Sequence, residues 1–264
     1  MPILSPGASG AEAVEVRDLV KAYQGGTRAV DGISLTVRRG EIFGCLGPNG
    51  SGKTTVTKIL VTLLKPTAGT ARITGIDVTA SPREVRKVIG YAGQFTGIDD
   101  DLTAAENAAF HGILHGLSHA EAWQRAPELL ATFELGDVAR QRAGRLSGGM
   151  RRRLDLALAL VHRPKVIFLD EPTTGLDPQS RAALWAELRR LSTEEGTTIF
   201  LTTQYLEEAD RAADRVAIID GGRLVAEGAP TVLKDGLGAN ATLDDVFLTH
   251  TGSQPRSEAR PGTQ

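Results

Sequence analysis

One stretch of nine residues, GPNGSGKTT, limits the fold of this 264-residue chain more than any other feature. It runs from Gly47 to Thr55 and matches the pattern G-x-x-x-x-G-K-[ST]. The apolar segment EIFGCLG before it predicts a strand, and GKTTVTKILVTLL after it has the apolar spacing of a helix. A strand, a glycine-rich loop and a helix in this order direct backbone N–H groups at phosphate oxygens. A plain glycine-rich loop is the alternative, but the lysine, the hydroxyl and both flanking elements argue against it.

Different residues of this loop are expected to contact different parts of a nucleotide. Lys53 would bridge the β- and γ-phosphates, and the Thr54 hydroxyl would ligate Mg²⁺. Because glycine has no Cβ, the glycines let the backbone approach the phosphates closely. The predicted nucleotide contacts are those of Gly47, Pro48, Asn49, Gly50, Ser51, Gly52, Lys53, Thr54 and Thr55.

Two adjacent carboxylates follow a second apolar segment, VIFLDE, at Val166 to Glu171. An all-apolar run is typical of a strand covered on both faces. Asp170 would hold Mg²⁺ through water, and Glu171 could accept a proton from an attacking water. The alternative is that the two carboxylates only cap the next loop, which the upstream phosphate loop makes a weaker interpretation. Together the two motifs predict a nucleotide hydrolase or a kinase.

The remaining patterns predict an α/β fold in one unit, from residue 14 to residue 250. Alternating segments near the N-terminus indicate antiparallel strands, and SPRE, TAAE and SHAE predict capping boxes at Ser81, Thr103 and Ser118. The middle of the chain, about residues 97–162, is expected to be a helical insertion. Residues 1–13 are expected to be a flexible lead and residues 251–264 a disordered tail.

Composition narrows the class further. The chain has 30 basic and 32 acidic residues, so its charge gives no reason to expect a nucleic-acid partner. A single cysteine, Cys45, excludes an internal disulfide and a cysteine-based zinc cluster. No apolar stretch approaches the roughly 20 residues that span a bilayer, and the first residues lack the pattern of a signal peptide.

A third motif, LSGGM, opens the helix MRRRLDLALAL about 20 residues before the carboxylate pair. Ser147, Gly148 and Gly149 would present N–H and hydroxyl donors at a helix N-terminus, which makes a second anion site on one chain. One nucleotide needs only one such cradle. Two chains that meet head to tail would explain the second, because each would offer LSGG to the nucleotide of the other.

In this order and spacing, the three motifs resemble those of the nucleotide-binding domain of ATP-binding cassette (ABC) transporters. The resemblance covers about residues 14 to 250, and LSGGM makes it specific. It implies a P-loop NTPase fold with a RecA-like core, an antiparallel β subdomain and an inserted α-helical subdomain. It also implies that ATP and Mg²⁺ bind between two copies of the chain. Hydrolysis would then drive motion in a separate membrane permease.

The family resemblance assigns four further residues to this site. Tyr23 in VKAY matches the aromatic residue that stacks on adenine. Gln94 in YAGQF matches the glutamine that touches Mg²⁺ and links to the membrane partner. Asp177 in TGLDP matches the loop that crosses to the other subunit, and Gln204 in LTTQYLE aligns with the switch histidine. An amide can donate to phosphate and hold the geometry there, but it cannot carry a proton, so ATP binding with poor turnover is the alternative to an active ATPase.

LSGGMRRRLDLALAL, LTTQYLEEAD and TLDDVFLTHTG resemble most closely the ATP-binding subunits of daunorubicin/doxorubicin-resistance exporters and related ABC-2-type exporters. This implies a homodimer at the cytoplasmic face of the membrane, acting on a drug, an antibiotic or another hydrophobic compound. Two other functions remain open: a soluble ABC-type ATPase of translation or DNA repair, and a nucleotide-gated regulator. The run Arg151 to Arg153 is interpreted as a solvated helix face rather than a nucleic-acid site. His111, His115 and His119 are interpreted as surface or hydrogen-bonded residues rather than metal ligands.

Overall fold

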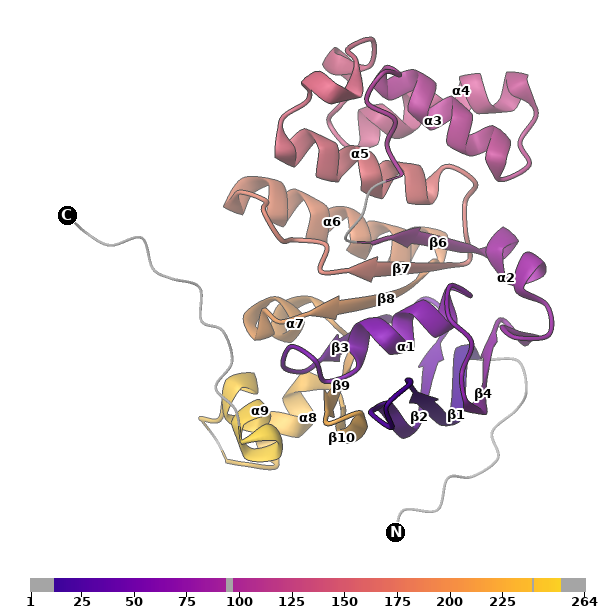
Figure 1. Ribbon diagram of the computed structural model, residues 1–264. Coiled ribbons are helices and arrows are strands. Elements are labelled where there is room, and N and C mark those ends of the chain that lie inside the picture. The colour runs from indigo at the N-terminus through magenta and orange to yellow at the C-terminus, as the bar shows by residue number, and fades with distance from the viewer. Residues whose placement is uncertain (1–11, 94–96, 239, 253–264) are drawn as a thin grey trace.

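The structure is a computed structural model that describes residues 12–93, 97–238 and 240–252 (Figure 1). Its centre is a six-stranded sheet in the order β10-β9-β3-β8-β7-β6, in which all neighbours run parallel except the pair β9 and β10. The strands of this sheet are β3 (Ile42–Leu46), β6 (Ile89–Ala92), β7 (Val166–Asp170), β8 (Thr198–Thr203), β9 (Arg215–Asp220) and β10 (Arg223–Gly228). The predicted α/β fold is confirmed.

A second sheet is antiparallel and has the order β2-β1-β4-β5. Its strands are β1 (Glu12–Ala22), β2 (Arg28–Arg38), β4 (Ala68–Ile73) and β5 (Ile76–Asp77). The expected antiparallel unit is therefore present. Its buried side chains join those of α1 (Lys53–Leu60) and one face of the central sheet in a single apolar cluster, which includes Phe43, Phe168 and Phe200.

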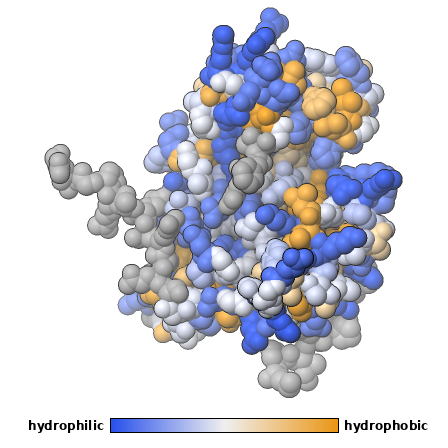
Figure 2. All heavy atoms as spheres, in the orientation of Figure 1, coloured by the Kyte–Doolittle hydropathy of each residue, from blue (hydrophilic) through white to orange (hydrophobic). Residues whose placement is uncertain are grey.

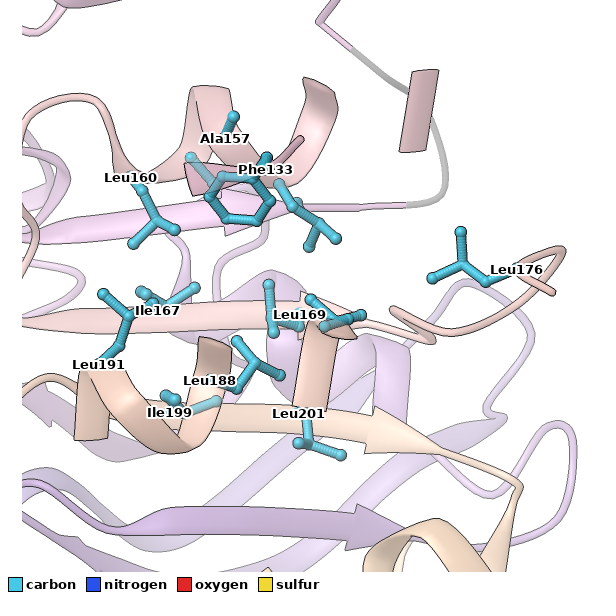
Figure 3. Close-up of a cluster of buried hydrophobic side chains, with 14 of the residues drawn as sticks. Phe133, Ala157, Leu160, Ile167, Leu169, Leu176, Leu188, Leu191, Ile199 and Leu201 are labelled. Atoms are coloured by element: carbon cyan, nitrogen blue, oxygen red, sulfur yellow. The ribbon is translucent and has the colours of Figure 1, made fainter. Parts of the chain in front are cut away.

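The opposite face of the central sheet packs against helices and forms a second apolar cluster. Figure 3 shows Ile167, Leu169, Ile199 and Leu201 of β7 and β8 among side chains from the neighbouring helices. These helices include α5 (Gly148–Leu160) and α6 (Pro178–Glu195). Because side chains alternate between the faces of a strand, the unbroken apolar sequence of β7 supplies both clusters.

Three helices, α3 (Ala104–Leu114), α4 (His119–Thr132) and α5, gather at one edge of the molecule beyond β6 (Figure 1). Thr103 and Ser118 each form the predicted capping box, with the side chain accepting from the N3 backbone N–H and the N3 glutamate reaching back. Each cap fixes where its helix begins.

The capping box predicted at Ser81 is wrong. Ser81 precedes α2 (Pro82–Val88), and Pro82 does occupy the first turn, but the serine side chain makes no capping hydrogen bond. Its ψ is 53°, whereas Thr103 and Ser118 have ψ of 165° and 159°. The carboxylate of Glu84 accepts from Lys87 Nζ at 2.8 Å instead of reaching back.

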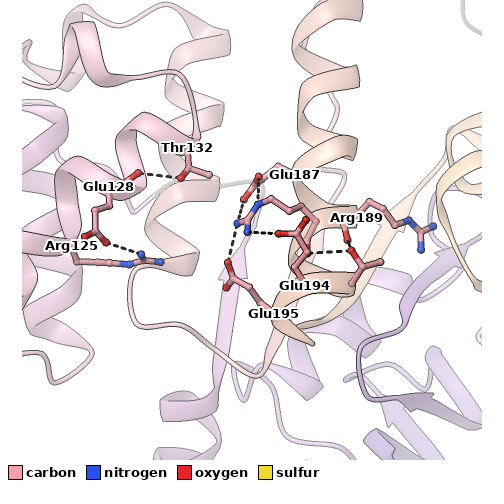
Figure 4. A network of polar contacts seen from close by, with 9 residues as sticks. Arg125, Glu128, Thr132, Glu187, Arg189, Glu194 and Glu195 are labelled. Atoms are coloured by element: carbon pink, nitrogen blue, oxygen red, sulfur yellow. Dashed lines mark hydrogen bonds and ion pairs between the residues drawn. The ribbon is translucent and has the colours of Figure 1, made fainter.

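The C-terminal end of α6 carries a group of polar contacts (Figure 4). Arg190 donates to Glu187 and to Glu195 at 2.7 and 2.9 Å, and the glutamates raise the pKa of its guanidinium. A cleft of about 230 Å³ lies here, between α4 and α6, away from the predicted catalytic carboxylates.

Shorter elements complete the chain. They are η1 (Gly136–Val138), η2 (Ala143–Arg145), α7 (Leu206–Ala212), α8 (Pro230–Asp235) and α9 (Leu243–Thr251). Within the described ranges, no helix combines the length and the apolar character needed to cross a bilayer.

Candidate nucleotide-binding site

Strands β3, β8 and β7 are neighbours in the central sheet and run parallel. Their carboxyl ends therefore lie side by side at the same edge of the sheet. The phosphate loop follows β3, the carboxylate pair ends β7, and Gln204 follows β8. The carboxyl ends of parallel strands are where open α/β sheets bind ligands. A pocket of about 510 Å³ lies there, lined by Ala29, Asn49, Gly50, Ser51, Gly52, Lys53, Thr54, Thr55, Glu171 and Gln204.

The loop geometry depends on two glycines with positive φ. Gly47 has φ of 154°, and a Cβ there would lie 2.2 Å from the carbonyl oxygen of Ile219. Gly52 has φ of 112°, and a Cβ there would lie 2.4 Å from the carbonyl oxygen of Ala29. Any side chain at either position would therefore displace backbone, which explains the need for glycine at these two ends of the loop.

The side chains of the loop fit an anionic ligand. Lys53 is almost fully buried, and its Nζ donates to the carbonyl oxygens of Gly47 and Pro48 at 2.6 and 2.9 Å. Burial lowers the pKa of the Lys53 ammonium, while the carboxylates of Glu171 and Asp170 act in the opposite direction. The buried Ser51 hydroxyl has no hydrogen-bond partner within the described part of the chain. Buried polar atoms are normally satisfied, so this hydroxyl fits a ligand that enters the loop.

Thr202 of β8 contacts both carboxylate residues. Its hydroxyl donates to Asp170 Oδ1 and accepts from the Glu171 backbone N–H at 3.2 Å. Sequence reasoning missed this residue, although the threonines of LTTQ are unusual polar residues in a buried strand.

The predicted catalytic residues Lys53, Glu171 and Gln204 are brought together, because all three line the pocket. Tyr23, predicted to stack on adenine, does not line it. Tyr23 is 46% exposed, and Lys21 Nζ lies over its ring, 5.6 Å from the ring centroid. Its predicted role stays a prediction.

The LSGG residues and Asp177 also lie outside the pocket lining. Ser147 is the N-cap of α5 and accepts from the Met150 N–H at 3.3 Å, and it is exposed, as is Gly148. Asp177 is the N-cap of α6, and its two hydrogen bonds from Ser180 lower the pKa of its carboxyl group.

The Mg²⁺ ligands were predicted to be Thr54, Asp170 and Gln94. Gln94 lies outside the described residues. Thr54 lines the pocket, and Asp170 ends the strand beside it. In the part of the chain that the structure describes, no three His, Cys, Asp or Glu side chains group in a way that could hold a metal ion by themselves. Hydroxyl and carboxylate oxygens still fit Mg²⁺, which keeps several waters and takes phosphate oxygens as ligands.

The interpretation of Arg151 to Arg153 as a solvated helix face is wrong, because the Arg151 and Arg153 side chains are only 28% and 18% exposed and that of Arg152 is exposed still less. Arg151 pairs with Asp100, and Arg153 pairs with Glu134. The Arg152 side chain is only 12% exposed and lies against the end of β7. Three identical letters in the sequence thus have different environments.

The comparisons with known proteins agree with this geometry. The family model described as ABC transporter matches residues 30–174. The chain is 52% identical over 247 residues to the daunorubicin/doxorubicin resistance ATP-binding protein DrrA of Streptomyces peucetius, covering 94% of this chain and 73% of that protein. The chain belongs to the ABC transporter family. The predicted ABC ATPase fold and activity class are thereby confirmed.

Two further ABC proteins are similar to this chain. A Nod factor export ATP-binding protein I of Paraburkholderia xenovorans is 46% identical over 84% of this chain and 73% of its own length. A dimeric ATP-binding cassette, solved in a post-hydrolysis state with ADP and Pi, matches with a TM-score of 0.75 and 30% identity. That match covers 82% of this chain and 98% of the cassette. This ABC chain is therefore the ATP-binding subunit of a transporter.

Proposed function

We propose that this ATP-binding subunit closes as a homodimer around two ATP molecules and drives a separate membrane permease that exports a hydrophobic compound. The carrying observation is the position of the LSGG residues: Ser147 and Gly148 lie at the exposed start of α5 and do not line the nucleotide pocket of their own chain. A head-to-tail pair would supply them to the pocket of the partner.

The residues of the pocket suit ATP hydrolysis. Lys53 and the backbone N–H groups of the loop would hold the phosphates, while Thr54 and Asp170 would hold Mg²⁺. When bound, Mg²⁺ would neutralise charge that develops on the β- and γ-phosphates. Glu171 would accept the proton of the attacking water, and Gln204 beside it would hydrogen-bond the terminal phosphate.

An apolar patch on the helical edge supports the proposed permease contact. Phe110, Ile113, Leu114 and Trp123 of α3 and α4 are each at least 41% exposed. Figure 2 shows apolar residues gathered over this upper edge of the molecule. Grouped exposed apolar side chains mark interaction surfaces, and a permease domain at the cytoplasmic face of the membrane would cover them.

The proposed cargo class follows from the relatives. The Streptomyces relative is named for daunorubicin and doxorubicin resistance, and the Paraburkholderia relative for Nod factor export. We therefore place this subunit with exporters of drug-like or other partly hydrophobic compounds. Drug accumulation should be lower in cells that carry the subunit together with its permease than in cells that carry the Lys53→Ala variant with the same permease, and equal accumulation would contradict the proposed cargo class.

Glu171→Gln tests the proposed chemistry. The amide keeps the shape of the side chain but cannot take a proton, so steady-state hydrolysis should fall on the order of 100-fold or more while ATP binding persists. The exposed Glu194→Gln, which removes a carboxylate that pairs with Arg190 at 3.6 Å, is the matched control and should stay within about twofold of the parent. Hydrolysis by Glu171→Gln at the parental rate would rule out the assigned base.

A further inference from the structure

Arg152 uses its whole guanidinium group within the fold. Nε donates to the carbonyl oxygen of Pro172 at 3.1 Å, and Nη2 donates to those of Asp170 and Glu171 at 3.0 and 3.1 Å. Nη1 donates to the carbonyl oxygen of Gly93 at 2.8 Å and to Asp155 Oδ2 at 3.1 Å. A guanidinium has five N–H donors in a rigid fork, and all five have an acceptor here.

These contacts join three segments that are far apart in the sequence. Arg152 belongs to α5, the helix that begins with the LSGG residues. The carbonyl oxygens of residues 170–172 belong to the end of β7, and Gly93 follows β6. One side chain therefore connects the start of the LSGG helix to the residue proposed as the general base.

The backbone of Glu171 needs such support because its φ is 48°, in the left-handed region that non-glycine residues seldom adopt. Its N–H donates to the carbonyl oxygen and the hydroxyl of Thr202, at 3.0 and 3.2 Å. Its carbonyl oxygen accepts from Arg152 Nη2 at 3.1 Å and from the Thr174 N–H at 3.3 Å. Arg152 thus holds both peptide groups that flank Glu171, through the carbonyl oxygens of Asp170 and Glu171.

Asp155, one helical turn after Arg152, is the buried counter-ion of the guanidinium. Burial raises the pKa of Asp155 to about 6, and the charge of Arg152 acts against that rise. A buried charge pair is by itself weak evidence for added stability, because desolvation offsets much of the attraction. The pair therefore suits a positioning role.

We propose that Arg152 is a positioning residue for ATP hydrolysis. It holds the Glu171 carboxylate at a fixed position relative to α5, the helix that begins with the LSGG residues. The proposal rests on the proposed role of Glu171. It predicts that the LSGG residues and the general base move as one unit when a second subunit binds. Loss of Arg152 should therefore impair the chemical step and leave nucleotide binding intact.

The experiment compares Arg152→Gln, Arg152→Lys and the matched control Arg153→Gln, in the full chain. Arg153 is the next residue and forms an ion pair with an exposed carboxylate, that of Glu134, at 2.8 Å, so its removal takes the same charge from the same helix. Arg152→Gln should lower kcat on the order of 10- to 100-fold, with Kd for ATP within about twofold of the parent. The kcat of Arg152→Lys should lie between those of the parent and Arg152→Gln, because an ammonium has three donors and no planar fork. The kcat of Arg153→Gln should stay within about twofold of the parent value.

A double-mutant cycle separates positioning from a general loss of folding. If Arg152 acts through Glu171, adding Arg152→Gln to Glu171→Gln should leave the residual single-turnover rate unchanged within about twofold. Should the two reductions multiply, or should Arg152→Lys turn over at the parental rate, the proposal is overturned. Failure of Glu171→Gln to reduce hydrolysis would instead reject the proposed base, which is a distinguishable result. If Arg152→Gln does not fold, Arg152→Lys in both backgrounds gives the same comparison.

Discussion

Gln204, which the family resemblance aligns with a switch histidine, lines the pocket together with Glu171. An amide can donate to a phosphate oxygen and accept from a donor opposite, so it can hold the geometry that a histidine would hold. The amide neither gains nor loses a proton near neutral pH. A titrating side chain is therefore absent at this position.

Substitutions at Gln204 should separate geometry from titration. Gln204→Ala should reduce kcat on the order of tenfold, because the hydrogen bonds to the terminal phosphate are lost, and Gln204→His should retain turnover. The parent should show no pH dependence from residue 204, whereas Gln204→His should gain an inflection near pH ~6.5. Steady-state rates from pH 5.5 to 8.5 give the comparison. An alanine variant as fast as the parent would reject the assigned role.

At the scale of single elements, local patterns predicted most of the fold. The strand, loop and helix around Gly47 and the caps at Thr103 and Ser118 were predicted because short-range chemistry defines them. Helix α1 ends at Leu60, whereas the sequence pattern predicted a helix as far as Leu64. The chain leaves the helix because Thr62 takes φ of 66°, and the N–H groups of Leu63 and Leu64 both donate to the carbonyl oxygen of Lys58.

Long-range contacts could not be predicted in this way. Arg152 donates to a backbone carbonyl oxygen 18 positions away in the sequence, and the Thr202 hydroxyl donates to a carboxylate 32 positions away; no letter pattern marks either contact. Ser81 failed as a capping box because the chain enters α2 from a turn, in which Asp77 Oδ1 accepts from the Thr79 and Ala80 N–H groups at 2.9 Å each. Tertiary contacts decided the first two cases, and a local turn decided the third.

The ends of α3 and α5 meet in a pair of stacked imidazoles. The rings of His115 and His162 lie 3.7 Å apart at an angle of 3°. His162 Nε2 lies 2.8 Å from the carbonyl oxygen of Ile89, so Nε2 carries the hydrogen, and the buried Nδ1 has no partner among the described residues. Burial, and then the neighbouring His115, lower the pKa of His162 to about 4.

This pair should make the stability of the protein depend on pH. Between pH ~6.5 and ~4 the unfolded chain takes up a proton at His162 that the folded chain does not, so stability is lost as the pH falls. Partial solvent screening limits the effect to about 1 kcal/mol between pH 7 and 5. His162→Gln keeps a donor for the Ile89 carbonyl and should flatten this dependence. Urea unfolding at both pH values measures it, and an equal loss in parent and variant would contradict the prediction.

At the scale of the whole molecule, the two surfaces that the proposed function assigns to one nucleotide site do not meet within a single chain. Lys53, Glu171 and Gln204 line one pocket, and Ser147 lies outside it on the exposed start of α5. In a two-fold pair, the same two surfaces meet twice, so each of the two sites combines the pocket of one copy with the LSGG residues of the other. A symmetric dimer thus completes both sites at once.

Mixed dimers should reveal this division of the site. Lys53→Ala removes the phosphate contact of its own pocket, and Ser147→Arg places a bulky side chain on the surface that would be offered to the partner. Each variant alone should have little ATPase activity. In an equal mixture, half of the dimers combine the two, and each has one intact pocket facing one intact LSGG surface, so about a quarter of the parental rate should return. Lys53→Ala mixed with Glu171→Gln is the control: both changes affect the pocket side, so no mixed dimer has an intact site. If the first mixture stays as inactive as the control, the two halves of the site do not come from different subunits.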